Sequence, residues 1–142
     1  MRRYKQVDIP QASNKWNNLK LGELKKAAQS FYLSEIEGKS CLNKSTGVTI
    51  SFPKSGIKHV LNFGNAGYVK FKFIEVLKKA IEVAEFKNFK LPDDDDGNNI
   101  IGYMNFNVKV KVEDKIENFR AVIRVTNDGK FYYNHSVKIK KP

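Results

Sequence analysis

The change in hydrophobic periodicity after Gly102 constrains the fold of this chain more than any other feature of its sequence. From Met104 to Val112 apolar side chains alternate with polar ones, which is the period of a half-buried strand. A second strand is predicted from Ile116 to Thr126, and the hairpin signal Asn127-Asp128-Gly129-Lys130 leads to a third, from Phe131 to Ile139. The C-terminal part of the chain is therefore expected to form an antiparallel meander.

The first half of the chain has the period of helices instead. Apolar residues recur at three- and four-residue intervals from Leu21 to about Tyr32 and, more clearly, from about Val69 to Ala84. A short strand over residues 48–52 and a short helix from Ser55 are predicted between them. Helices followed by strands indicate an α+β fold, in which the N-terminal helices pack on one face of the C-terminal antiparallel sheet and leave its other face open.

The length of 142 residues fits one domain. We expect a single α+β domain over residues 20–142, preceded by a basic leader over residues 1–19 that need not be ordered. Asp93–Asp96 is expected to be an exposed loop between the helical and strand parts. This run lacks the alternating ligands and final glutamate of a calcium loop, and Cys41 with two histidines cannot make the usual four-ligand zinc site. No metal or cofactor is predicted.

The charge balance points to a class of partner. The chain has 26 Lys and Arg against 15 Asp and Glu, a formal net charge of +11, which favours polyanions and first of all nucleic acid. A lysine-rich surface without a specific partner is the alternative. No apolar stretch reaches the roughly 20 residues of a membrane helix, and none follows the basic N-terminus as in a signal peptide. We therefore expect a cytoplasmic protein without a membrane partner, with export by another route and the oligomeric state left open.

Strict alternation sorts the strand side chains into two faces. It assigns His135 to the apolar face with Tyr133 and Val137, where a histidine is more typical of a core or rim position. It assigns to the open face Tyr103, Asn105, Asn107, Arg120, Arg124, Thr126, Tyr132, Asn134, Ser136 and Lys138. Such a face suits single-stranded nucleic acid, because arginines pair with phosphates and tyrosines stack on bases. An ordinary solvated sheet face has a similar composition, so both interpretations stay open.

Two histidines are candidates for chemistry. His59 lies on the predicted short helix near Lys54 and Lys58, where a partly exposed imidazole can transfer a proton, although a plain surface histidine fits equally well. Metal-free RNA cleavage needs a base for the 2′-OH, an acid for the leaving oxygen and cations for the phosphate. His59, His135 and the arginines would supply these roles. Phosphate-binding loops and nucleophile elbows are absent from the sequence, and the setting of Cys41 gives no support for a nucleophile.

Three segments together resemble a known group of domains. They are Thr46–His59, Leu77–Ile81 and Arg124–His135. They resemble the large polyvalent protein-associated domains of phages and mobile elements, and the related nucleases of barnase–EndoU–colicin–RelE type. The likeness covers about residues 20–139. It implies a helix-plus-antiparallel-sheet fold and a metal-independent RNase or toxin-like nuclease, with RNA as the favoured partner and an immunity or antitoxin protein as a further candidate partner.

The resemblance also implies where the cleft lies. The segment that contains His59 and the polar residues of the last two strands would line it. We therefore predict His59, Arg124 and His135 as the catalytic residues. The predicted substrate-binding residues are Lys54, Lys58, Arg120, Tyr132, Ser136 and Lys138. The alternative is a non-catalytic accessory domain of a polyvalent protein that contacts nucleic acid or another protein.

Overall fold

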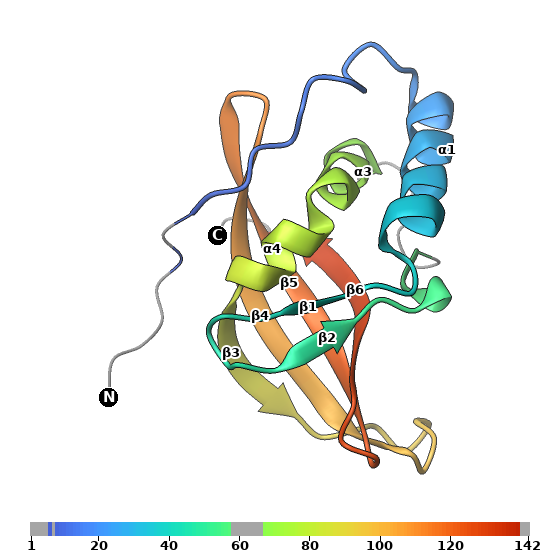
Figure 1. Ribbon diagram of the computed structural model, residues 1–142, viewed down its shortest axis with the longest axis vertical. Helices are drawn as coiled ribbons and strands as arrows, with labels where there is room; N and C mark the ends of the chain where they lie inside the picture. Colours follow the sequence, from blue (N-terminus) through green and yellow to red (C-terminus); the bar gives the residue numbers. More distant parts are fainter. Residues whose placement is uncertain (1–5, 7, 58–66, 140–142) are drawn as a thin grey trace.

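A layer of helices covers one face of a curved sheet in the computed structural model, which describes residues 6, 8–57 and 67–139 (Figure 1). Within these residues the sheet has six strands in the order β1-β2-β6-β5-β4-β3. Neighbouring strands are antiparallel except for β2 and β6, which are parallel. The predicted α+β class, with the N-terminal helices on one face of the sheet, is confirmed.

The helical layer follows the predicted apolar pattern with one break. It consists of α1 (Leu21–Phe31), a π-helical turn η1 (Tyr32–Ile36), a 3-10 turn η2 (Lys54–Ile57), α3 (Gly67–Glu75) and α4 (Leu77–Val83). The single helix predicted over residues 69–84 is two helices, because Val76 leaves the helical conformation at φ −110° and ψ 16°. Within the described part of the chain, none of the helices is long and apolar enough to cross a membrane.

The three predicted meander strands are present as β4 (Ile100–Val112), β5 (Lys115–Thr126) and β6 (Phe131–Lys138). The predicted strand over 48–52 is β2 (Thr49–Ser51), which pairs with a second short strand, β1 (Ser40–Leu42). The edge strand β3 (Glu85–Lys90) was not predicted. Its side chains are mostly exposed and several are charged, so its sequence lacks the alternation of apolar and polar residues that predicts a strand. Charged residues are common at sheet edges.

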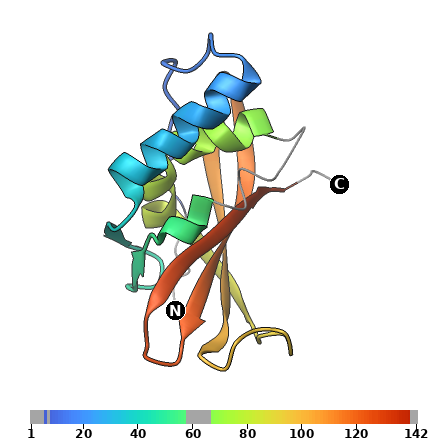
Figure 2. The same ribbon diagram turned by 90° about the vertical axis from the view of Figure 1, so that its right-hand side faces the viewer.

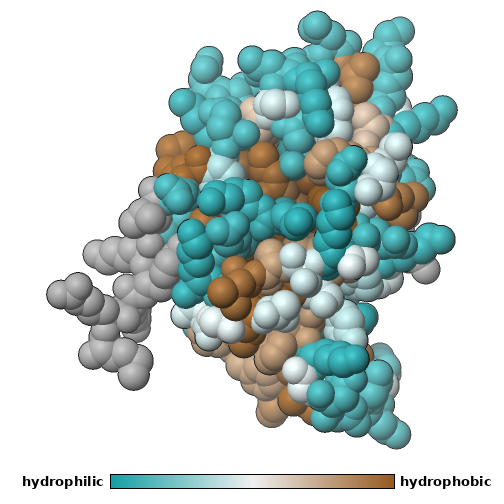
Figure 3. Space-filling model, viewed as in Figure 1, coloured by the Kyte–Doolittle hydropathy of each residue, from teal (hydrophilic) through white to brown (hydrophobic). Residues whose placement is uncertain are grey.

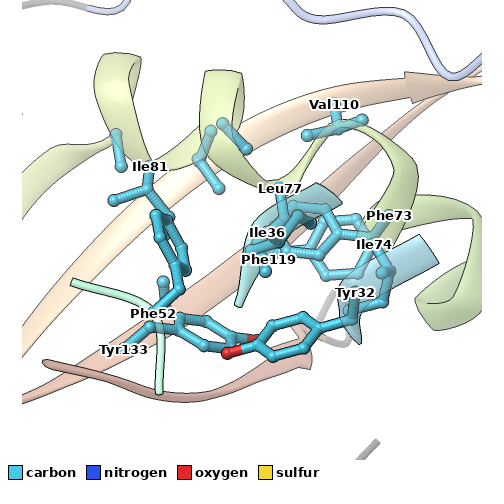
Figure 4. Close-up of a cluster of buried hydrophobic side chains, with 14 of the residues drawn as sticks. Tyr32, Ile36, Phe52, Phe73, Ile74, Leu77, Ile81, Val110, Phe119 and Tyr133 are labelled. Carbon is cyan, nitrogen blue, oxygen red and sulfur yellow. The ribbon is translucent and has the colours of Figure 1, made fainter. Parts of the chain in front are cut away.

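Packed aromatic and aliphatic side chains join the helices to the sheet (Figure 4). Phe73 of α3 stacks on Phe119 of β5 with ring centroids 4.1 Å apart. The buried Tyr32 donates its hydroxyl hydrogen bond to the carbonyl of Pro53, 2.5 Å away. Each fully buried side chain of this size contributes about 1.5–3 kcal/mol through removal of apolar surface from water. The core therefore holds the sheet against the helices and fixes the strands that carry the side chains of its other face.

Part of the predicted leader packs on this domain. Trp16 is buried in the core. The fully buried Lys72 of α3 donates hydrogen bonds to the carbonyl of Ser13 and to Oδ1 of Asn17, each at 2.5 Å. The Glu75 carboxylate accepts from the Ser13 hydroxyl at 2.8 Å. Residues 13–17 are thus attached to α3, while the domain boundary at residue 20 stays a prediction.

The two faces of the molecule differ in character. Seen from the helical side, polar residues predominate over the helices, although some apolar residues reach the surface there, and further apolar residues are exposed over the part of the sheet beyond them (Figure 3). Phe89 in β3 is 46 % exposed. The opposite face of the sheet has no layer upon it among the described residues (Figure 2). We call it the open face, and its side chains are the ones that a ligand meets directly.

Candidate functional site

A β-bulge in β6 decides which side chains reach the open face. Val122 on β5 lies opposite His135, but the next residue, Ile123, lies opposite Tyr133, so Asn134 is an extra residue in β6. One extra residue reverses the alternation of everything that follows it. Residues directly opposite each other on antiparallel strands share a face, so His135 lies with Val122 on the open face.

The bulge makes the predicted placement of four β6 residues wrong: His135, Ser136, Val137 and Lys138. His135, expected on the apolar face, lies on the open face. Ser136, expected on the open face, is only 2 % exposed, and its hydroxyl lies 2.8 Å from the hydroxyl of buried Tyr133. Lys138 follows Ser136 by two residues onto the covered face, where its Nζ lies 3.1 Å from the carboxylate of Glu117. The physical reason is that one inserted residue interrupts the alternation of side chains between the two faces of the strand, and no pattern in the sequence reveals this insertion.

The open face contains a hollow of about 410 Å³, which we call the central hollow. Its size falls within the range of small-molecule sites, about 300–1,000 Å³. Cationic side chains, an imidazole, amides and carboxylates meet in it. The lining residues come from β3 to β6 and the loop after β3: Lys90, Asp93, Asp96, Tyr103, Asn105, Arg120, Val122, Asn134, His135 and Val137.

Four of the predicted site residues share this face. Arg120 is exposed and lines the central hollow together with His135. Arg124 lies opposite Tyr132, and its guanidinium carbon is 5.3 Å from the centroid of the tyrosine ring. This is a cation–π arrangement, which holds the ring and the cation in fixed relative positions.

The imidazole of His135 has a neighbour that orients it. The side-chain nitrogen of Asn134 lies 2.9 Å from Nδ1 of His135. The amide donates to Nδ1 of a neutral ring, and with its oxygen turned toward the ring it accepts from an imidazolium. The contact can therefore form with either protonation state of the ring.

The acidic loop predicted over Asp93–Asp96 borders the same hollow. Asp96 accepts hydrogen bonds from the hydroxyl of Tyr103 and from the backbone N–H of Asp93, both at 2.8 Å. The carboxylate of Asp93 lies 3.9 Å from Nζ of Lys90. Burial and the hydrogen bond to Asp96 together raise the pKa of Tyr103 to about 12, so this hydroxyl stays protonated. Carboxylates of this loop thus line the same hollow as His135.

The remaining predicted site residues are not part of the central hollow as described. Lys54 lies in η2, which packs on the covered face of the sheet. Gly56 of the same turn is so close to the core that a Cβ placed on it would lie 2.8 Å from the ring of Tyr133. Lys58 and His59 lie outside the described residues. The proposed joint action of His59 with Arg124 and His135 therefore stays a prediction.

Other kinds of chemistry find little support. Burial, followed by the charge of Glu82, raises the pKa of the Cys41 thiol to about 11, so the reactive thiolate is scarce at neutral pH. In residues 6, 8–57 and 67–139 no group of three or more His, Cys, Asp or Glu side chains is placed to hold a metal ion.

Comparison with known proteins gives one match. The family model of large polyvalent protein-associated domain 3 matches residues 20–133. Neither a curated protein nor a solved structure matches the chain. The matched range begins at the residue before α1 and ends within β6, so it contains Arg120, Arg124 and Tyr132 and ends just before the bulge. The implied relationship to barnase–EndoU–colicin–RelE nucleases is not confirmed by this match.

Proposed function

The chain belongs to the large polyvalent protein-associated domain 3 family, and from this premise we propose that it binds RNA on the open face and cleaves it there without a metal ion. The observation that carries the proposal is the bulge at Asn134, which brings His135 into the central hollow beside Arg120. Cleavage of RNA needs groups that move protons and cations that stabilise the charged phosphate in the transition state. Both kinds of group line this hollow.

Charge and amide groups support the binding step. The formal net charge of +11 attracts a polyanion from a distance. In the hollow, the cations Arg120 and Lys90 can pair with phosphates, and the amides of Asn105 and Asn134 can bond to base edges. An arginine offers two parallel N–H bonds to a phosphate, which fixes the orientation of the backbone as well as its position.

In the chemical step, a group on one side of the hollow accepts a proton from the RNA, and a group on the other side donates a proton to it. The 2′-oxygen attacks phosphorus, and a carboxylate of the acidic loop takes its proton. The bond from phosphorus to the 5′-oxygen breaks, and the imidazolium of His135 protonates that oxygen, leaving a 2′,3′-cyclic phosphate and a 5′-hydroxyl. Arg120 stabilises the charge that grows on the phosphate oxygens.

A second candidate is binding without cleavage, and one observation favours it. Both oxygens of the Asp96 carboxylate already accept hydrogen bonds, and Asp93 is paired with Lys90. A surface whose carboxylates are occupied holds RNA but lacks a base for the 2′-OH.

One experiment separates the two candidates. Purified protein is incubated in EDTA with single-stranded RNA and with the same RNA carrying 2′-O-methyl groups, which prevent attack by the 2′-oxygen. We expect cleavage of the unmodified RNA alone, with a loss of about 100-fold or more in His135→Ala. We expect Arg120→Ala to weaken binding and to lower the salt slope by about one phosphate contact.

The controls and contrary results are distinct. Lys109→Ala changes an exposed cation of β4 that does not line the hollow, so it should leave the cleavage rate near that of the wild type. Binding without cleavage by the wild type would select the second candidate. Absence of both binding and cleavage would refute the use of the open face for RNA.

A further inference from the structure

We propose that a second hollow on the open face, at β2 and the beginning of β6, is a stacking site for one unpaired RNA base, with Tyr132 as its aromatic wall. The hollow has a volume of about 400 Å³. It is lined by Thr49, Ser51, Gly129, Lys130, Phe131 and Tyr132. The inference rests on the proposed function, because it takes the open face as the RNA surface, and it adds which part of the RNA this hollow holds.

The strand register places three side chains in one row. Arg124 on β5 lies opposite Tyr132 on β6, and Tyr132 lies beside Ser51 on the parallel strand β2. Neighbouring strands are about 4.8 Å apart, so each side chain borders the next. The guanidinium of Arg124 covers the ring from the β5 side, 5.3 Å from its centroid, and the hollow lies on the β2 side. Tyr132 is thus a wall between a cation and an open space.

The chemistry of the lining fits a base with its adjoining phosphate. The ring offers a stacking plane, the hydroxyls of Thr49 and Ser51 donate to or accept from base edges, and the exposed Lys130 attracts the phosphate. Only an unpaired base exposes both of its faces, so the ligand is a single strand and not a duplex. Stacking accepts any base, so this site contributes affinity with little sequence preference.

Contacts within the chain hold the turn and the tyrosine ring that line this hollow. In the turn between β5 and β6, the backbone N–H of Gly129 donates to the carbonyl of Thr126 at 3.0 Å, and the N–H of Thr126 donates to the carbonyl of Lys130 at 3.0 Å. These bonds fix the turn that carries Lys130, and Arg124 restrains the ring of Tyr132. A preformed site loses less conformational entropy on binding.

The two hollows lie close enough to hold one strand. Along β5, the row of Val122 and His135, which lines the central hollow, is the next row on this face after that of Arg124 and Tyr132. Same-face rows are separated by two residues, about 7 Å along the strand. One RNA chain can therefore place a base against Tyr132 while a neighbouring phosphate reaches the central hollow.

The test measures binding of the full chain to a fluorescent, 2′-O-methylated single-stranded RNA about eight nucleotides long, which is within the usual size of such sites. Tyr132→Ala should weaken binding about 5- to 140-fold, which corresponds to about 1–3 kcal/mol for one stacked base. Tyr132→Phe keeps the ring and should bind within about twofold of the wild type. Tyr68→Ala, a tyrosine change in α3 on the covered side, should leave affinity unchanged.

A second comparison assigns the effect to a base. An RNA in which one nucleotide at a time is abasic should lose affinity for the wild type at one position, and Tyr132→Ala should bind that RNA and the intact RNA equally. Ser51→Leu fills the hollow without a ring or a charge and should weaken binding with Tyr132 in place, so the test does not depend on the folding of one variant.

The outcomes separate the two proposals. If Arg120→Ala weakens RNA binding while Tyr132→Ala and Ser51→Leu do not, the stacking site is wrong and the proposed function stands. If duplex RNA binds as tightly as the single strand and Tyr132→Ala weakens both equally, the unpaired base is refuted. If the wild type binds no RNA, both proposals fall together.

Discussion

Replacement of Ser136 by alanine tests the bulge that positions the candidate site. Ser136 is 2 % exposed, and its hydroxyl lies 2.8 Å from that of Tyr133, which is fully buried. Burial raises the pKa of Tyr133, so its hydroxyl is a neutral group that needs a partner. Ser136→Ala leaves this hydroxyl without one, and an unsatisfied buried polar group costs about 1–3 kcal/mol. With unbroken alternation Ser136 would face solvent, and its replacement would change stability by less than about 0.5 kcal/mol.

The assay is thermal unfolding of the wild type and matched variants. Ser136→Ala should lower Tm by about 2–12 °C, given about 1–3 kcal/mol and about 2–4 °C per kcal/mol for a chain of this size. Ser30→Ala, at an exposed position of α1, should change Tm by about 2 °C or less. The double variant Tyr133→Phe with Ser136→Ala removes both hydroxyls and should cost less than the sum of the single changes. Equal Tm values for Ser136→Ala and the wild type would refute the register of β6 after Asn134.

Two further predictions concern the edge of the sheet that borders the central hollow. The pKa of Tyr103 in the folded chain, about 12, exceeds its ordinary value of 10.0, so the unfolded chain loses this proton first and stability falls as the pH rises from about 10 to 12. In urea denaturation at a series of pH values, Tyr103→Phe should show a shallower fall in stability. Parallel curves for the variant and the wild type would contradict the assignment. Gly102→Ala should destabilise by about 1–3 kcal/mol in the same assay, because φ is +156° and a Cβ would clash with the ring of Phe89. Gly22→Ala, with open space around it, should not destabilise.

The long strands of the meander were predictable, because alternation that continues over ten or more residues has one consistent assignment to faces. In β4 every residue from Phe106 to Val112 has the predicted burial. In β6 the pattern is ambiguous, because Val137 and Ile139 extend the alternation of Phe131 and Tyr133 as if no residue were inserted. The hydrogen bond between Tyr133 and Ser136 forms only in the bulged register, where both side chains are buried. A polar side chain in the core does not show as such in the alternation of apolar and polar residues. The sequence therefore predicted the strand but not the bulge.

The position of the acidic loop at the edge of the open face could not be derived from periodicity for a related reason. The sequence predicted a loop at Asp93–Asp96, and the structure has no helix or strand there. Its place beside the open face depends on β3, since β3 pairs antiparallel with β4 and the loop must return the chain at that edge. Without β3, nothing in the sequence related Asp96 to Tyr103. When a site includes a loop between two paired strands and one of those strands is not predicted, the periodicity of the sequence cannot show that the loop borders the site.

The carboxylates of this loop change what the net charge of +11 means at the site. The exposed pair between Asp93 and Lys90, at 3.9 Å, contributes about 1 kcal/mol or less, so an RNA phosphate can replace Asp93 on the lysine at little cost. Asp96 differs, because Tyr103 and a backbone N–H hold its two oxygens and it is less exposed than its neighbours. The loop therefore acts as a wall of the central hollow with one movable carboxylate, and attraction from a distance comes from the cations of the rest of the chain. Under the proposed function, this leaves Asp93, once separated from Lys90, as the carboxylate available to a 2′-OH.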